Sequence, residues 1–224
     1  MSEERVWLVT GASRGIGLAV AQRIVDAGDR VALFARGDAV HSVADELGSN
    51  CLACQADVSK PDDVRAAIAS IISHWGRLDV VVNNAVLMVP GMLANHDSRA
   101  WRQNFAVSLD GAMYLMREAF PELKKNGGAV VNVASVCGLL GSTGTAGYSA
   151  AKAGMLALTR NAAIEWGKQG VRVNAVIPGV FLTPPTEGLM PDEESQAATA
   201  RSVPIGRIGD PVECANAIAF LASD

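Results

Sequence analysis

The sequence predicts an α/β fold in which a doubly wound parallel sheet lies between two layers of helices. Short apolar runs alternate with longer helical patterns along all 224 residues. The runs are almost uninterrupted in apolar character, as expected for parallel strands that are buried on both faces. Neither an internal repeat nor a low-complexity linker divides the chain, so we expect residues 1–224 to form one three-layer αβα domain.

Six short runs are the candidate strands. They are RVWLVT (5–10), RVALFA (30–35), CLACQ (51–55), LDVVVN (78–83), AVVNVA (129–134) and VRVNAVI (171–177). The helical pattern after the first run, GLAVAQRIVDAG, ends at a glycine, which is a common helix stop. Residues 178–208 are rich in proline, glycine and acidic residues and have no clear periodicity. We expect this stretch to be an irregular lid over a substrate site.

Composition excludes several classes of protein. Half of the residues are hydrophobic, and the formal net charge is −4, which argues against nucleic acid or an anionic membrane as the main partner. The start, MSEERVWLVT, lacks the apolar core of a secretory signal, and no run of about 18 apolar residues predicts a membrane span. We therefore expect a cytoplasmic protein that does not bind membranes.

The four cysteines do not predict a metal site. Cys51 and Cys54 are three positions apart in a candidate strand, so their side chains are expected on opposite faces of the sheet. No second pair or suitably spaced histidine completes a zinc site, and Cys137 and Cys214 are isolated in the sequence. We expect free thiols, mostly buried, and no bound metal.

A glycine-rich turn, TGASRGIG (10–17), follows the first candidate strand directly. Gly11, Gly15 and Gly17 permit a tight turn, a close approach of the backbone to a pyrophosphate, and a helix packed near the strand. The N-terminus of that helix offers free N–H groups to phosphates. In this position the turn predicts a Rossmann-like dinucleotide site.

Tyr148 and Lys152 lie four positions apart on a predicted helix, which places both side chains on one face. The pKa of a free phenol is about 10, and a neighbouring ammonium lowers it. An isolated pair with this spacing is usually an ordinary surface feature. Ser135, which comes just after a candidate strand and shortly before Tyr148, favours a catalytic role for the three residues.

The motifs TGASRGIG, NNA (83–85), NVAS (132–135), YSAAK (148–152) and IPGVFLT (177–183) follow one another along nearly the whole chain. In this order and spacing they resemble the short-chain dehydrogenase/reductase family. The resemblance implies hydride transfer between a nicotinamide cofactor and a ketone or secondary alcohol. It also implies a homo-oligomer, either a dimer or a tetramer.

The resemblance also implies roles for individual residues. Tyr148 is the expected general acid/base, and Ser135 the expected hydrogen-bond donor to the substrate oxygen. Lys152 is expected to hold the nicotinamide ribose hydroxyls and to lower the pKa of Tyr148. Asn83 and Asp57 are expected on the adenosine side, and Thr183 at the carboxamide. The implied cofactor-binding residues are Gly11, Ser13, Arg14, Gly15, Ile16, Gly17, Arg36, Asp57, Val58, Asn83, Ala85, Tyr148, Lys152, Pro178, Gly179 and Thr183.

The second candidate strand ends at Ala35, where relatives that use NAD carry an acidic residue for the ribose 2′-hydroxyl. Arg36 follows it, and Arg14 lies in the glycine turn. Guanidinium groups bind phosphate in a bidentate manner, so this pair predicts a preference for NADP(H).

The sequence departs from the family pattern at Ser108, where the spacing from Trp101 to Gly111 calls for a catalytic asparagine. In relatives that residue is expected to bind, through its backbone in a kinked helix, a water that links the lysine to solvent. A serine either keeps this backbone role or binds water through its hydroxyl. Ser108 also falls within an apolar helical stripe, where a hydroxyl needs a partner. The stripe is formed by Trp101, Phe105, Ala112, Leu115 and Ala119.

Two further departures concern the pocket and the C-terminus. Val86 stands where the family has glycine. We expect its branched side chain either to narrow the nicotinamide end of the cofactor site or to reshape the substrate pocket. The chain stops at AIAFLASD, where relatives continue into one more strand, so either a tail is omitted or the protein is truncated.

The expected substrate is a small apolar carbonyl or alcohol, for example a 3-oxoacyl thioester, a steroid, a quinone or a cyclic ketone. The apolar residues expected around it are Val86, Leu87, Met88, Phe181, Leu182, Leu189 and Met190. The alternative function is a sensor or scaffold that binds NADP(H) with little or no catalysis.

Overall fold

The computed structural model describes residues 4–183, 186, 188 and 190–223. Its sheet has the strand order β3-β2-β1-β4-β5-β6, and all neighbouring strands are parallel. The strands are β1 (Val6–Thr10), β2 (Arg30–Ala35), β3 (Cys51–Gln55), β4 (Val80–Asn83), β5 (Ala129–Val133) and β6 (Arg172–Val176). Each lies within two residues of the bounds predicted from sequence, and the predicted doubly wound α/β fold is confirmed.

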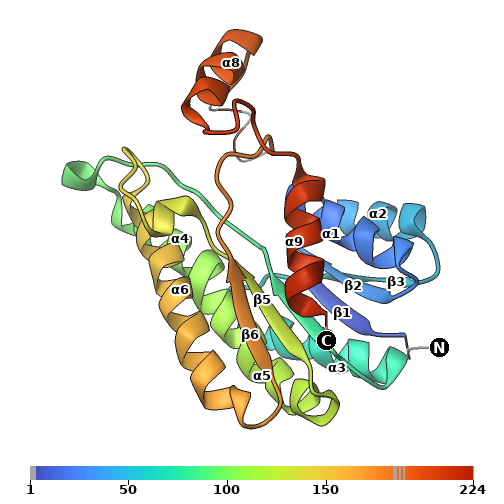
Figure 1. Ribbon diagram of the computed structural model, residues 1–224. Helices are drawn as coiled ribbons and strands as arrows, with labels where there is room; N and C mark the ends of the chain where they lie inside the picture. Colours follow the sequence, from blue (N-terminus) through green and yellow to red (C-terminus); the bar gives the residue numbers. More distant parts are fainter. Residues whose placement is uncertain (1–3, 184–185, 187, 189, 224) are drawn as a thin grey trace.

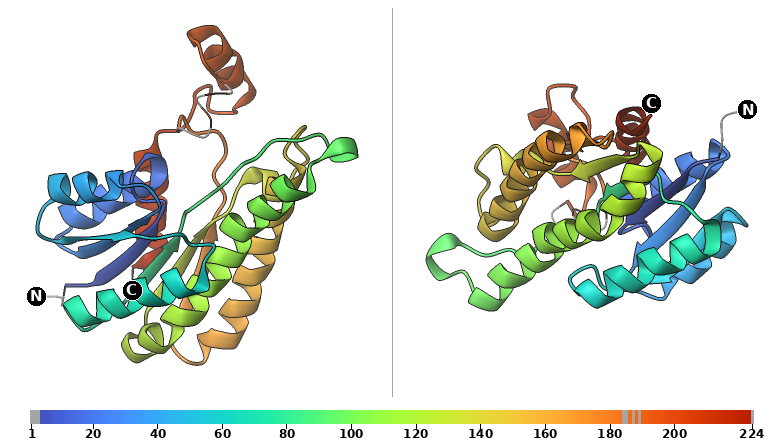
Figure 2. Two further views of the ribbon diagram at one scale, coloured as in Figure 1. Left: turned by 180° about the vertical axis from the view of Figure 1, so that it is seen from behind. Right: turned by 90° about the horizontal axis from the view of Figure 1, so that it is seen from below.

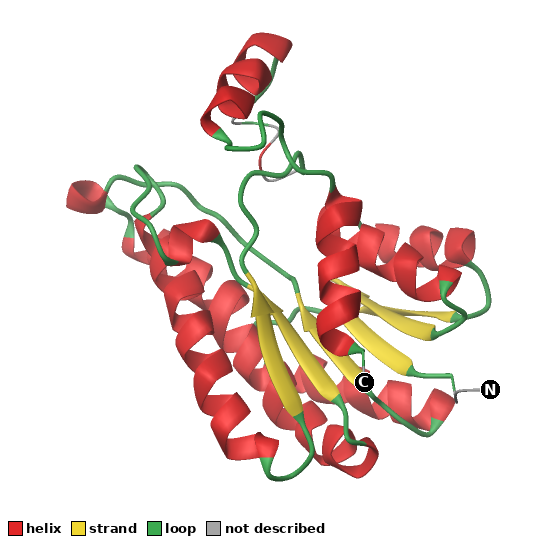
Figure 3. Cartoon of the chain, in the orientation of Figure 1, coloured by secondary structure: helices red, strands yellow, loops and turns green. Residues whose placement is uncertain are grey.

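Helices cover both faces of the sheet (Figures 2 and 3). One face packs against α3 (Pro61–Trp75), α5 (Gly111–Asn126) and α6 (Ala146–Gly167). The other face packs against α1 (Gly15–Asp26), α2 (Ala39–Leu47) and α9 (Pro211–Ala222). The chain order reverses direction between β1 and β4, and in open α/β sheets ligands bind at the carboxyl ends of the strands beside such a point.

Strand residues alternate between the two hydrophobic layers. Leu8 belongs to the layer under α3 and α5, whereas Trp7 and Val9 belong to the layer under α1 and α9. Cys54 and Cys51 divide in the same way, which confirms that the two side chains lie on opposite faces. Both thiols are free, and burial raises the pKa of each to about 11.

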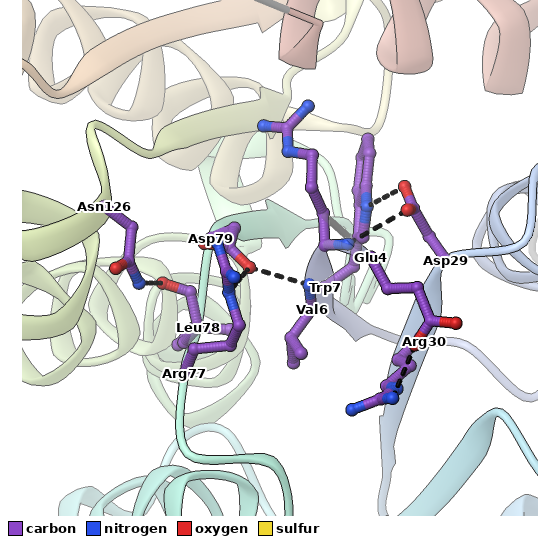
Figure 4. A network of polar contacts seen from close by, with 10 residues as sticks. Glu4, Val6, Trp7, Asp29, Arg30, Arg77, Leu78, Asp79 and Asn126 are labelled. Atoms are coloured by element: carbon purple, nitrogen blue, oxygen red, sulfur yellow. Dashed lines mark hydrogen bonds and ion pairs between the residues drawn. The ribbon is translucent and has the colours of Figure 1, made fainter. Parts of the chain in front are cut away.

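A polar network closes the amino-terminal end of the sheet (Figure 4). The Asp79 carboxylate accepts a hydrogen bond from the Val6 amide at 2.8 Å and pairs with Arg77 at 2.9 Å. Asp29 accepts a hydrogen bond from the indole nitrogen of Trp7 at 2.9 Å. These contacts lie at the end of β1 and β4 that is remote from their carboxyl ends.

The predicted helical stripe around Ser108 is interrupted. Helix α4 (Ser98–Phe105) runs into a π-helical turn, η2 (Ala106–Asp110), before α5 begins. In that turn the Gly111 amide bonds to the Ala106 carbonyl, five residues back. Asn104 occupies the fully buried face of α4, and Trp101 and Phe105 of the stripe are half-buried beside it. The two aromatic rings contact each other with their centres 5.0 Å apart.

Residues 178–208 are less irregular than expected, because they contain α8 (Glu193–Ser202). Asp192 caps this helix by accepting a hydrogen bond from the Ser195 amide at 2.8 Å, a signal that the surrounding prolines and glycines concealed. Helix α8 has no buried residue and stands apart from the body of the molecule (Figure 1). Its role as a lid stays a prediction. Among the described residues, no helix is long and apolar enough to cross a membrane.

Candidate active site

The glycine turn connects β1 to α1 through two left-handed backbone positions. Gly11 has φ +66° and Gly15 has φ +56°, conformations that side chains rarely adopt. A Cβ atom on Gly17 would lie only 2.2 Å from the Gly11 carbonyl oxygen. The first turn of α1 therefore packs directly on the end of β1, and a larger residue at position 17 would separate them.

The N-terminus of α1 is open to an anion. The residue at the N-cap position, Arg14, makes no side-chain cap, and the first turn contains no acidic residue. Gly15 and Ile16 of that turn line a neighbouring cavity. Free N–H groups at the positive end of the helix dipole suit a phosphate or pyrophosphate.

Asn84, which the sequence reasoning missed, braces this turn. Its side-chain amide donates hydrogen bonds to the carbonyl oxygens of Thr10 at 2.9 Å and Gly11 at 3.3 Å. Its backbone amide donates to the Thr10 hydroxyl at 2.9 Å. The end of β4 is thereby fixed to the glycine turn across the reversal in strand order. The second asparagine of the NN pair was the available signal in the sequence.

The cavity beside the turn, called here the glycine-turn cavity, has a volume of about 390 Å³. Its predicted lining residues include Gly11, Ser13, Arg14, Gly15, Ile16, Arg36, Val58, Ala85 and Thr183, joined by Phe34, Ala35 and Ala56. Arg14 and Arg36 are both exposed. Within the described part of the chain, neither arginine has an ion-pair partner, and Asp38 does not line the cavity.

A second cavity of about 110 Å³, called here the tyrosine cavity, continues from the first. It contains Ser135, Tyr148 and Lys152 together, so the fold gathers the three predicted catalytic residues from the end of β5 and from α6. The two cavities share Ile16, Asn84, Val86 and Thr183. They form one cleft over the carboxyl ends of β1, β4 and β5.

Burial dominates the electrostatics of Tyr148 and Lys152. It raises the pKa of the Tyr148 phenol, and a hydrogen bond with the Ser135 side chain offsets only part of this effect. It lowers the pKa of Lys152 to about 7. The Lys152 ammonium donates a hydrogen bond to the Val133 carbonyl at 2.5 Å and lies 5.9 Å from the centre of the Tyr148 ring. The family resemblance implies a lowered pKa for Tyr148, so the raised pKa found here is opposite to that expectation.

Ser135 and Thr183 are held by backbone contacts at the edge of the cleft. The Ser135 hydroxyl accepts a hydrogen bond from the Cys137 amide at 3.2 Å, at the start of the short 3₁₀ helix η3 (Val136–Gly138). The Thr183 amide donates to the Thr186 hydroxyl at 2.9 Å. Pro178 and Gly179 line the tyrosine cavity beside them.

The hydroxyl of Ser108 is fully buried and has partners. It accepts a hydrogen bond from the Leu87 amide and donates one to the Leu87 carbonyl, both at 3.3 Å. Ser108 lies in the π-helical turn η2, which agrees with the kinked helix that the resemblance implies. Its side chain is therefore tied to the segment after β4 and does not line either cavity.

Three predicted cofactor residues do not line the cleft. Asn83 is buried within the sheet, where its side-chain amide donates to Asn132 at 2.8 Å. Asp57 binds the Ser59 hydroxyl at 2.7 Å, while its neighbour Val58 lines the glycine-turn cavity. Gly17 acts through the close packing described above. Asn83 is the last residue of β4 and stays inside the sheet. Asn84, the first residue after the strand, lines the cleft instead.

The apolar residues expected around the substrate are divided. Val86, Met88 and Phe181 line the tyrosine cavity, whereas Leu87 packs into the core. Leu182 is exposed, Met190 is buried away from the cavity, and Leu189 lies outside the described residues. Among the described residues, no group of three or more histidine, cysteine or acidic side chains is placed to hold a metal ion.

Comparison with known proteins places the chain among reductases and dehydrogenases. The family model described as enoyl-(acyl carrier protein) reductase matches residues 11–224. A 3-oxoacyl-(acyl-carrier-protein) reductase of Staphylococcus aureus is 37% identical over 223 residues, covering 97% of this chain and 90% of the relative. The corresponding protein of Vibrio cholerae is also 37% identical, covering 99% and 91%. A cis-4-hydroxycyclohexanecarboxylate dehydrogenase of Sinomonas cyclohexanicum is 40% identical over 226 residues, covering 99% and 90%.

Proposed function

Because the chain belongs to the short-chain dehydrogenase/reductase family, an oxidoreductase family acting on CH–OH and ketone groups, we propose that it is an NADP(H)-dependent carbonyl reductase or alcohol dehydrogenase. The observation that carries this proposal is the continuity of the cleft. Ser135, Tyr148 and Lys152 line a cavity that shares four lining residues with the one formed by the glycine turn.

The glycine-turn cavity fits a nicotinamide dinucleotide. The uncapped N-terminus of α1 suits the pyrophosphate, and Phe34 and Ala35 at the end of β2 give an apolar wall. Arg14 and Arg36 would hold a ribose 2′-phosphate, since guanidinium groups bind phosphate well. Neither forms a close ion pair among the described residues, although the charge of Arg36 helps to lower the pKa of Asp57. When bound, the cofactor supplies or accepts the hydride.

Tyr148 acts as the general acid in the direction of carbonyl reduction. Burial raises the pKa of its phenol, so the proton is retained near neutral pH until the developing oxyanion takes it. Ser135 lies in the same cavity and donates a hydrogen bond to the same substrate oxygen. In the direction of alcohol oxidation, Tyr148 accepts the proton instead.

Lys152 stabilises the phenolate that Tyr148 becomes after proton transfer. Its ammonium lies on the same side of α6 as the phenol, near the centre of the ring. Burial lowers the pKa of Lys152 to about 7, so its charge is only partly present at neutral pH. An anion forming beside it favours the ammonium, because opposite charges stabilise each other's ionised forms. We assign the cofactor's ribose hydroxyls to the same ammonium.

The substrate is a carbonyl or alcohol with an apolar body. Val86, Met88 and Phe181 surround the catalytic side chains and give one side of the cavity an apolar surface. A 3-oxoacyl thioester and a cyclic ketone both satisfy this requirement. The relatives in Staphylococcus aureus and Sinomonas cyclohexanicum carry names of these two classes.

We also propose that the protein is a homo-oligomer. Two large apolar side chains are strongly exposed on helices that flank the sheet: Ile164 on α6 at 79% and Phe220 on α9 at 76%. Exposed apolar surface of this kind favours association. Sedimentation of the purified chain tests this point, with a monomer at micromolar concentration as the contrary result.

The function is tested with a panel of carbonyl compounds that includes a 3-oxoacyl thioester and substituted cyclohexanones. Loss of NADPH is followed by absorbance, and binding of NADPH is measured in parallel by fluorescence. Turnover of at least one class supports the reductase. Tight NADPH binding without turnover across the panel, and without oxidation of the matching alcohols by NADP⁺, would indicate the sensor or scaffold instead.

A further inference from the structure

The segment Val86–Pro90, called here the strap, forms one wall of the tyrosine cavity. It follows β4, has no helix or strand of its own, and alternates its side chains as an extended chain does. Val86 and Met88 line the cavity, while Leu87 between them packs into the hydrophobic layer under α3 and α5. The position of the strap therefore sets how much room the substrate has beside Tyr148.

Two side chains hold the strap by its backbone. Ser108 binds both the amide and the carbonyl of Leu87, as described above. Asn104 does the same at Val89: its Oδ1 accepts from the Val89 amide at 3.1 Å, and its Nδ2 donates to the Val89 carbonyl at 3.1 Å. The two residues lie one helical turn apart and bind alternate strap residues, as a neighbouring strand would.

Asn104 is built into this position. Its side chain is fully buried, and Nδ2 donates a further hydrogen bond to the Ala100 carbonyl at 3.0 Å. All the hydrogen-bonding capacity of the amide group except one lone pair is thus used. Removing a buried polar group with several partners leaves those partners unsatisfied, which is costly for the backbone groups of the strap.

Asn104 also contacts the helix that carries Tyr148. A Cβ atom on Gly147 would lie 3.0 Å from Asn104 Nδ2, so the backbone beside Tyr148 packs closely against this amide. One side chain therefore touches both the strap and the first turn of α6.

We propose that Asn104, with Ser108 as its partner, is a positioning residue that fixes the strap relative to Tyr148 and thereby determines which substrates fit. The expected effect on substrate selectivity rests on the proposed reductase function. The hydrogen bonds by which Asn104 and Ser108 hold the strap, called here the clamp, do not depend on turnover. Asn104 touches neither cavity, so its effect reaches the substrate only through Val86 and Met88.

The test uses Asn104→Ala in the full chain, with Asp79→Ala as the matched control. Asp79 is also a buried polar residue that binds a backbone amide, that of Val6, but it lies at the opposite end of β4. Hydrogen exchange of individual amides is measured by NMR, together with kcat/KM for a small and a bulky cyclic ketone. Thermal unfolding of both variants shows how much general stability each has lost.

We expect Asn104→Ala to accelerate exchange at Val89 by at least about tenfold and to leave Val6 unchanged, with the reverse pattern in Asp79→Ala. The ratio of kcat/KM between the bulky and the small ketone should change by at least about tenfold in Asn104→Ala alone. KM for NADPH should stay within about twofold, because Asn104 does not line the glycine-turn cavity. An unchanged selectivity ratio, with unfolding temperatures lowered alike in both variants, would overturn the proposal.

A milder variant keeps the test decisive if Asn104→Ala does not fold. Asn104→Ser retains a hydroxyl that can bind the Val89 backbone as Ser108 binds that of Leu87, but it lacks the second donor for the Ala100 carbonyl, so a smaller shift in the same direction is expected. If the wild-type chain reduces no ketone, the proposed function is overturned. Hydrogen exchange at the Val89 amide then shows, without any turnover, whether the clamp exists. Exchange at Val89 that neither variant accelerates would contradict the clamp.

Discussion

The ammonium nitrogen of Lys152 lies 5.9 Å from the centre of the Tyr148 ring; Lys152 is almost fully buried, whereas Tyr148 is half-buried and lines the tyrosine cavity. Burial moves the two groups in opposite directions, raising the pKa of the phenol and lowering the pKa of the ammonium. Both shifts favour the neutral forms. The pair is therefore arranged so that charge appears mainly when a proton leaves Tyr148 during the reaction.

Lys152 should make the stability of the chain depend on pH above neutrality. Its pKa is about 7 in the folded chain and near 10.5 when unfolded, so the unfolded state binds more protons between these values and stability rises with pH there. Relative to Lys152→Met, wild type should lose about 1.4 kcal/mol for each pH unit from pH 9 down to pH 7. Below pH 7 the difference should level off. The free energy of unfolding of both proteins, measured with denaturant at several pH values and without cofactor, checks this prediction. If the two free energies change with pH in parallel, the prediction is contradicted.

Arg36 should distinguish the phosphorylated cofactor from the unphosphorylated one. Arg36→Ala is expected to lower kcat/KM for NADPH by about tenfold to a hundredfold, because a charge-assisted hydrogen bond to phosphate is lost. The value for NADH should change little, and Arg14→Ala should act in the same direction. Steady-state kinetics with both cofactors provide the measurement. Wild type that uses NADH as well as NADPH, or variants that lose both equally, would refute the assignment.

Ser108→Asn should preserve or increase turnover. At Val89 the amide group of Asn104 binds both backbone groups at 3.1 Å, whereas the Ser108 hydroxyl reaches both groups of Leu87 only at 3.3 Å. An asparagine at 108 has a separate donor and acceptor for the same task. Turnover and exchange at the Leu87 amide report the result. A large fall in turnover would show that the packing around this buried position requires serine.

Val86 should limit the size of the substrate through its side chain alone. Among the described residues, positive φ angles occur only at glycine, so the valine at this position is not strained. Its side chain lines both cavities at their junction. Val86→Ala is expected to raise kcat/KM for a bulky ketone over a small one by about tenfold. The same two ketones serve as probes, and an unchanged ratio would assign the limit to another residue.

The sheet was predictable because its strands combine apolar runs with a glycine turn at a recognisable place. The alternation of Cys51 and Cys54 between faces also followed from strand geometry alone. Helix α8 was missed because its start depends on a side-chain cap from Asp192 within a stretch that resembles a loop in composition. The apolar stripe on α4 did not indicate Asn104, because a polar residue adds nothing to an apolar pattern, although it is the fully buried one. The helix kink at Ser108 was implied only by the family resemblance, and a π-helical turn lies there.

The candidate site was predicted best where a motif determines a backbone shape. Ser135, Tyr148 and Lys152 meet in one cavity, as their motifs indicated. Asn83 and Asn84 show the limit: which of two adjacent asparagines reaches the cleft depends on the residue at which β4 ends. Asn104 had no signal of its own, because its partners are backbone groups of the strap, which carry no sequence pattern.

Turnover by wild type and by Tyr148→Phe, measured with NADPH and the best ketone of the panel, tests the central claim most directly. Phenylalanine preserves the ring and removes only the hydroxyl that carries the proton. We expect kcat to fall by at least about a hundredfold, the contribution typical of a general acid. NADPH binding, measured by fluorescence, should stay within about twofold, since the substitution removes a single hydroxyl and leaves the lining of the glycine-turn cavity unchanged. A Tyr148→Phe protein that retains most of its turnover would contradict this account of the active site.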